Sequence, residues 1–133
     1  MIDAYSGDSI PTHLITEEAF DLYRKALKPD GILACHLSNW HIDLWPVMKA
    51  AAKHLGFNVL GEASVKVYSE YADATSWAFL SKDPFEPRMP DCCHVVDFAQ
   101  IADRPLIRDA CGSMIFNIRF NYAPPTTDGF RWE

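Results

Sequence analysis

The segment LKPDGILACHLSN, residues 27–39, decides the fold of this 133-residue chain. Its Pro-Asp-Gly portion ends a helix and favours a tight turn, because proline lacks an amide hydrogen and glycine tolerates turn conformations. Residues 32–37 form a short, nearly continuous apolar run, which is typical of a strand buried on both faces. Ser38 and Asn39 then follow as a polar loop at the carboxyl end of that strand.

Helices are predicted on both sides of this strand. The first begins after Thr16, a good N-cap residue, and Glu17 and Glu18 suit the positive end of the helix dipole. The second begins near Asp43 and is closed by Gly56. Apolar residues recur at helical spacing in both segments. They are Ala19, Phe20, Leu22, Tyr23, Ala26 and Leu27 in the first helix, and Val47, Met48, Ala51, Ala52 and Leu55 in the second.

Further strands are predicted over residues 57–63 and 75–81, and Ile2-Asp3-Ala4 has the character of a strand end. The resulting order is strand end, helix, strand, helix, strand, strand. Such alternation predicts an α/β fold with a mainly parallel sheet covered by helices. After Pro84 the pattern predicts a short helix over residues 95–102, a strand over residues 114–120 and an irregular tail.

Charge and cysteine content narrow the function classes. Twelve Lys and Arg against eighteen Asp and Glu give a net charge of −6, which disfavours nucleic acid or an anionic membrane as a partner. We expect no transmembrane span and no signal peptide, and therefore a cytoplasmic protein with reduced thiols. Cys92-Cys93-His94 lacks a second pair of ligands, so we expect no metal site.

Four motifs carry a resemblance to a known family. They are DAYS at residues 3–6, IPTHL at 10–14, LKPDGIL at 27–33 and SN at 38–39. Together they resemble the spermidine synthase-like proteins, the polyamine aminopropyltransferases. The resemblance implies the C-terminal half of a Rossmann-like class I methyltransferase fold, in which residues 57–63 and 75–81 are the terminal antiparallel pair. It divides the chain into a partial domain at 1–83 and a C-terminal extension at 84–133.

The resemblance also implies a reaction and its site. An aminopropyl or methyl group would pass to an amine from an S-adenosyl donor, either S-adenosylmethionine or its decarboxylated form. Asp3 matches the first aspartate of the family's catalytic loop and would accept the proton of the attacking amine. The second aspartate of that loop falls at Ser6. The remaining implied contacts are Ser6, Asp8 and Tyr71 for the substrate and Tyr5, Ser38 and Asn39 for the nucleoside.

Some of these residues, and two histidines, also have a purely structural interpretation. Asp8 suits a turn, Tyr71 suits a half-exposed surface position, and His13 and His36 suit structural histidines. The strands that carry the family's glycine-rich cofactor turn have no counterpart in this sequence. We therefore expect a partial catalytic domain that is inactive alone and is completed by an N-terminal half or a homodimer. The alternative is a non-catalytic interaction domain or a remnant that has lost cofactor binding.

Overall fold

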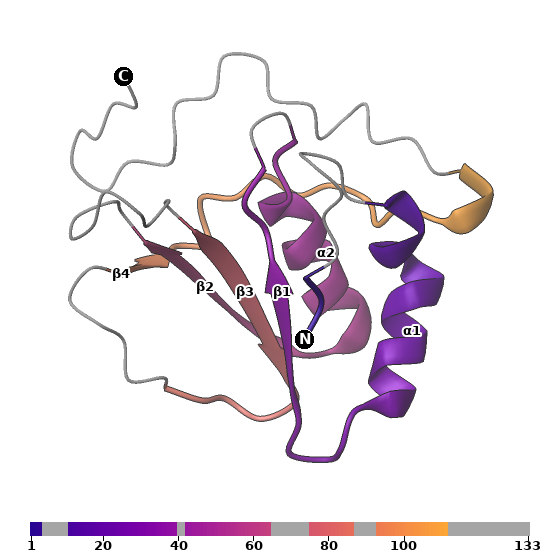
Figure 1. Cartoon of the computed structure of the whole chain (residues 1–133), viewed down its shortest axis with the longest axis horizontal. Helices are drawn as coiled ribbons and strands as arrows, with labels where there is room; N and C mark the ends of the chain where they lie inside the picture. The colour runs from indigo at the N-terminus through magenta and orange to yellow at the C-terminus, as the bar shows by residue number, and fades with distance from the viewer. Residues whose placement is uncertain (4–10, 40–41, 65–74, 87–92, 112–133) are drawn as a thin grey trace.

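A computed structural model describes residues 1–3, 11–39, 42–64, 75–86 and 93–111 of the chain (Figure 1). It contains two α-helices and four strands in these segments, together with two short 3-10 turns. The elements are α1 (Glu17–Ala26), β1 (Ile32–His36), α2 (Trp45–Leu55), β2 (Asn58–Ser64), β3 (Ser76–Ser81) and β4 (Cys93–Val96). In the described segments, neither helix has the length and apolar character that a membrane crossing would need.

The four strands form one sheet in the order β1-β3-β2-β4, and every neighbouring pair is antiparallel. The prediction of a mainly parallel, Rossmann-like methyltransferase sheet is therefore wrong. Its physical reason lies in β3, which inserts between β1 and β2. The strands β1 and β2, which α2 connects, run in the same direction, as the alternation of strands and helices predicts. They share no hydrogen bonds, however, because β3 lies between them. β2 and β3 pair antiparallel, as expected for residues 57–63 and 75–81. They are not the terminal pair of the sheet, because β4 pairs with the outer edge of β2.

Parallel pairing among the described residues is limited to two isolated bridges. One joins Ile2 to Cys35 and the other joins Thr16 to Ile107. In the first bridge, the amide of Ile2 donates to Ala34 O at 2.7 Å and the amide of His36 donates to Ile2 O at 2.9 Å. The start of the chain therefore lies beside β1, and the residue after Ile2 is placed next to the carboxyl end of that strand.

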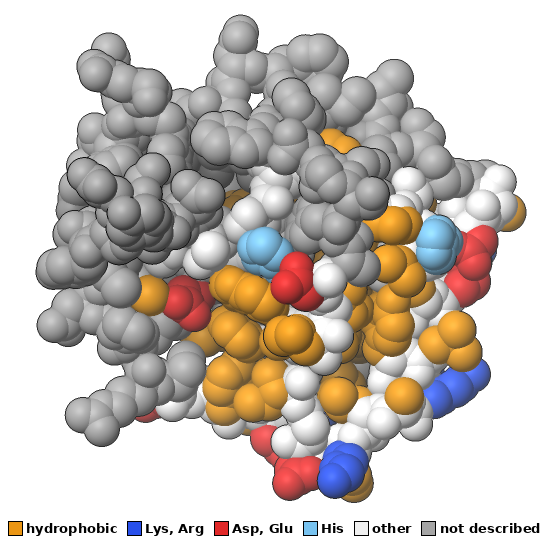
Figure 2. Space-filling view, viewed as in Figure 1, with side chains coloured by type: hydrophobic (Ala, Val, Ile, Leu, Met, Phe, Trp, Pro, Cys, Tyr) orange, Lys and Arg blue, Asp and Glu red, His pale blue; other side chains and the backbone are white. Residues whose placement is uncertain are grey.

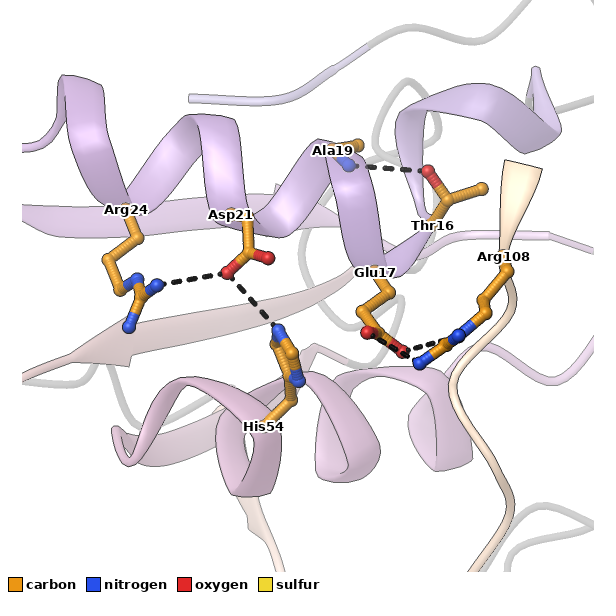
Figure 3. Close-up of polar contacts among 7 residues, drawn as sticks. All are labelled: Thr16, Glu17, Ala19, Asp21, Arg24, His54 and Arg108. Atoms are coloured by element: carbon orange, nitrogen blue, oxygen red, sulfur yellow. Dashed lines mark hydrogen bonds and ion pairs between the residues drawn. The ribbon is translucent and has the colours of Figure 1, made fainter. Parts of the chain in front are cut away.

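Both predicted helices are confirmed, with local differences at their ends. The Thr16 hydroxyl accepts from the Ala19 amide at 3.3 Å, as an N-cap side chain should (Figure 3). In α2 the N-cap residue is Leu44, while the carboxylate of Asp43 accepts from the Trp45 amide at 3.1 Å. Gly56 closes α2 with a φ of 67°, a left-handed conformation that glycine adopts without a Cβ penalty.

The helix predicted over residues 95–102 is wrong, because β4 occupies Cys93–Val96 and a turn follows it. Asp97 drives this turn, since its carboxylate accepts from the Ala99 amide at 2.9 Å and its carbonyl accepts from the Gln100 amide at 3.1 Å. A side chain that satisfies nearby amides in this way competes with helix formation. The predictions for residues 114–120 and for the tail lie outside the described residues.

The core lies between one face of the sheet and the two helices. Strand residues Leu33, Ala78 and Leu80 are buried there against α1 and α2, and α2 lies behind the sheet in Figure 1. We call this side the core face. From the segment after Pro84, Ile101 and Ile107 also enter the core. The Arg108 guanidinium makes two hydrogen bonds, at 2.9 and 3.0 Å, with the Glu17 carboxylate and so holds that segment on α1 (Figure 3).

Candidate functional site at the carboxyl end of strand β1

The side of the sheet opposite the core face carries a different set of side chains, which we call the second face. Strand alternation places them there, because neighbours of buried residues point the other way. They include Ile32, Ala34, His36, Leu60, Glu62, Trp77 and Phe79. None of them belongs to the hydrophobic core. Figure 2 shows hydrophobic side chains gathered on this side, next to a histidine and acidic side chains.

The strand register arranges the second face in rows. His36 lies opposite Trp77, which in turn lies opposite Glu62 on β2. The next row is apolar and consists of Ala34, Phe79 and Leu60. A polar row therefore borders an apolar row at the end of the sheet where β1 finishes.

A chain of three polar side chains begins at the end of that polar row. The Asp3 carboxylate lies 2.9 Å from Nδ1 of His36, and Nε2 of His36 lies 2.8 Å from the Ser38 hydroxyl. Asp3 reaches the imidazole because the Ile2 bridge sets it beside β1, and Ser38 reaches it because residues two apart on an extended chain share a side. Aspartate, imidazole and hydroxyl thus stand in one hydrogen-bonded series.

The series fixes a direction for the proton on His36. An ionised carboxylate can only accept, so in the neutral imidazole Nδ1–H donates to Asp3 and Nε2 is left as the acceptor for the Ser38 O–H. The Ser38 oxygen in turn accepts from the Ser76 amide at 2.9 Å. The Asp3 carboxylate therefore holds the neutral imidazole in the tautomer that is protonated at Nδ1, while Nε2 is occupied by the Ser38 hydroxyl.

Aromatic rings hold the imidazole in place. The His36 ring is stacked on Trp77 with centroids 4.7 Å apart and planes at 21°. The centroid of the Trp77 ring lies 6.5 Å from that of Phe79, and the centroid of the Phe79 ring lies 6.3 Å from that of Phe85. Side-chain exposure is 20% for His36 and 46% for Asp3. The imidazole is thus sheltered, while the carboxylate remains open to solvent.

The structure brings two of the sequence-predicted site residues together and separates a third from them. Asp3 and Ser38 are joined through His36, as described above. Asn39 is buried, and its side-chain oxygen accepts from the Ile42 amide at 2.8 Å, which supports the loop before α2. Tyr5, Ser6, Asp8 and Tyr71 lie outside the described residues.

His36 is the residue whose role the sequence reading missed. The sequence alone predicts a structural histidine here, because a lone histidine in an apolar run usually is one. The available signal was its two-residue spacing from Ser38 at the end of a predicted strand, which puts both side chains on one side. The position of Asp3 carried no comparable signal, because it depends on a bridge between residues 33 positions apart.

The neighbouring cysteine has no part in this chemistry. Cys35 points to the core face, and burial raises the pKa of its thiol to about 12, against a small opposing effect of the N-terminal amino group. A thiol of that pKa stays protonated at neutral pH and is a poor nucleophile. Among the described residues there is also no group of three or more His, Cys, Asp or Glu side chains that could hold a metal ion.

Comparison with known proteins adds no assignment: no family model, curated protein or solved structure matches this chain.

Proposed function

We propose that the chain forms part of the catalytic domain of a spermidine synthase-like transferase, with Asp3 and His36 as its proton-accepting pair. The observation that carries the proposal is the 2.9 Å contact between the Asp3 carboxylate and His36 Nδ1. The proposal rests on these side chains and on the resemblance in residues 3–6, 10–14, 27–33 and 38–39, and not on the class of sheet, since fold alone does not determine function.

The proposed step is a displacement at the carbon next to a sulfonium. The amine nitrogen forms a new bond to that carbon, and the carbon–sulfur bond breaks with its electron pair going to sulfur, which becomes a neutral thioether. The ammonium formed in this way loses one proton to Asp3, whose carboxylate is exposed on one side and held by His36 on the other. General-base assistance of this kind contributes about two to four orders of magnitude in rate.

Electrostatics favour the same substrates. The sulfonium donor is a cation, and a diamine acceptor keeps one cationic ammonium while its other, neutral nitrogen attacks; the chain carries a net charge of −6. Glu62 lies in the same row as His36, with the Trp77 indole between them. Carboxylates and the face of an aromatic ring are the groups that attract organic cations. The rest of the nucleoside site would come from another part of the protein or from a second chain.

Thermal unfolding of the chain with and without ligands tests this proposal. The ligands are methylthioadenosine, S-adenosylmethionine, its decarboxylated form and 1,4-diaminobutane. A ligand that binds the folded state stabilises it by about 2.7 kcal/mol at a hundredfold excess over its dissociation constant. We expect Asp3→Asn to abolish the shift given by the diamine. Asp30→Asn, at an exposed turn, is the matched control and should keep it.

Two results would overturn the proposal. One is a cooperative transition that none of the four ligands shifts, which would favour the alternative of a non-catalytic interaction domain. The other is a shift with the diamine that Asp3→Asn and Asp30→Asn leave equally intact, since Asp3 would then not contact the amine.

A further inference from the structure

A depression of about 450 Å³ lies on the outer side of α2, and none of its lining residues belongs to the sheet. One wall is the last two turns of α2, and the other is the segment at residues 103–106. Its volume is within the range of about 300–1,000 Å³ that small-molecule sites occupy. The proposed transferase site uses none of these residues.

Two cationic side chains, Lys53 and Arg104, line this depression from its two walls. Within the described segments, neither forms a salt bridge or a side-chain hydrogen bond. The chain as a whole carries eighteen acidic side chains against twelve basic ones. Two cations that line one depression and have no acidic partner among the described residues are therefore available for an anion from outside.

The other ionisable side chains at the depression, Asp103 and His54, already have partners. Asp103 lies 3.3 Å from the ammonium of Lys49, which also donates to Ile101 O at 2.6 Å. His54 lies 3.2 Å from the Asp21 carboxylate on α1 (Figure 3). The first set of contacts ties residues 101–103 to α2, and the second ties α1 to α2. Both walls are thus fixed, while Lys53 and Arg104 remain without partners in the described chain.

The rest of the lining is largely apolar and is formed by Ala50, Pro105 and Leu106. Leu106 also packs against the core and is half-buried, so this part of the wall is anchored. Guanidinium groups bind phosphate and carboxylate oxygens in a bidentate manner, and ammonium groups add a point charge. A ligand that satisfies the whole depression needs an anionic group together with an apolar one.

We propose that this depression binds a small organic anion, a phosphate or carboxylate attached to an apolar group. Lys53 and Arg104 contact the anionic group, and Ala50, Pro105 and Leu106 contact the apolar group. The site is independent of the Asp3–His36 pair, so either proposal can fail without the other.

Titration of the ¹⁵N-labelled chain with phenyl phosphate, benzoate, inorganic phosphate and benzyl alcohol, followed by amide chemical shifts, tests this inference. We expect saturable shifts at residues 49–54 and 103–106 with phenyl phosphate or benzoate. We expect inorganic phosphate and benzyl alcohol each to bind about tenfold more weakly, since each lacks one of the two contacts, worth about 1.4 kcal/mol. Phenyl phosphate and benzoate together distinguish a phosphate ligand from a carboxylate ligand.

Variants assign the binding to the two cations. Lys53→Gln and Arg104→Gln should each weaken binding about tenfold for whichever of phenyl phosphate and benzoate binds more tightly. Both side chains are exposed, so we expect the two substitutions to leave the fold intact. Lys82→Gln, an exposed lysine after β3, is the matched control and should leave the affinity unchanged. Shifts that map elsewhere would overturn the proposal, as would equal affinity in all three variants or equal binding of phenyl phosphate and inorganic phosphate.

Discussion

The two faces of the sheet contrast sharply although the same strands build both. On β3, Ala78 and Leu80 are fully buried on the core face, while Trp77 and Phe79 are half-buried on the second face. The core face is packed against α1 and α2, whereas the second face carries the aromatic side chains of Trp77 and Phe79 and the Asp3–His36–Ser38 series. Alternation along β3 thus places the residues that stabilise the fold on one face and the aromatic side chains beside the candidate site on the other.

The largest expected effect on stability comes from truncating Leu80 on the core face, and its neighbour Phe79 on the second face is the comparison. Leu80→Ala should lower the free energy of unfolding by about 2–5 kcal/mol, because it leaves a cavity in a fully buried position. Phe79→Ala removes a larger side chain but should cost less than half as much, since the ring is partly exposed. Urea denaturation of both variants measures the difference. Equal losses would mean that the second face is as much a core as the first.

A close approach at Gly61 gives the next largest effect. A Cβ at this position would lie 2.8 Å from side-chain atoms of Trp45, Val96 and Phe98, so Gly61→Ala should cost about 1–3 kcal/mol through overpacking. Gly56→Ala is the matched control, because a Cβ there meets nothing within 4 Å and only the left-handed backbone is penalised. Relief of the Gly61→Ala loss by Val96→Ala, measured as a double-mutant cycle, would identify the steric cause.

These contrasts also show what the sequence could and could not predict. Both helices and three of the four strands follow from local patterns, because caps, glycine stops and apolar spacing act over a few residues. The sheet order does not, since insertion of β3 between β1 and β2 is a non-local pairing. In the site, Asp3 and Ser38 could be proposed from the resemblance. The contact of Asp3 with His36 could not be predicted, because it depends on the bridge between Ile2 and β1.

Alkaline pH should destabilise the core face through Cys35. Its folded-state pKa is raised from 9.0 to about 12, so the unfolded chain releases the proton first and stability falls as the pH rises above 9. The loss should be about 1 kcal/mol at pH 10 and should continue toward pH 12. Cys35→Ala should reduce this slope. Tyr23, whose pKa is also raised by burial and then by Cys35, leaves a residual slope in the variant. Identical slopes in the two proteins would contradict the buried neutral thiol.

A smaller effect is expected where α1 begins beside the core face. Thr16→Ala removes the hydroxyl that accepts from the Ala19 amide and should cost about 1 kcal/mol. Hydrogen exchange at the Ala19 amide is the specific readout: it should accelerate in Thr16→Ala and stay slow in Thr16→Ser, which keeps the hydroxyl. Slow exchange in both variants would show that the cap bond does not protect this amide.

The Asp3–His36–Ser38 series is the centre of the candidate site, and the tautomer of His36 tests it most directly. Long-range ¹H–¹⁵N correlation spectra of the labelled chain should show the neutral imidazole protonated at Nδ1, with Nε2 as the acceptor. Exposed His94, for which no side-chain partner occurs among the described residues, should show the mixture of an unconstrained imidazole. Asp3→Asn should weaken the Nδ1 preference. An Nε2-protonated His36, or a tautomer that Asp3→Asn leaves unchanged, would contradict the account.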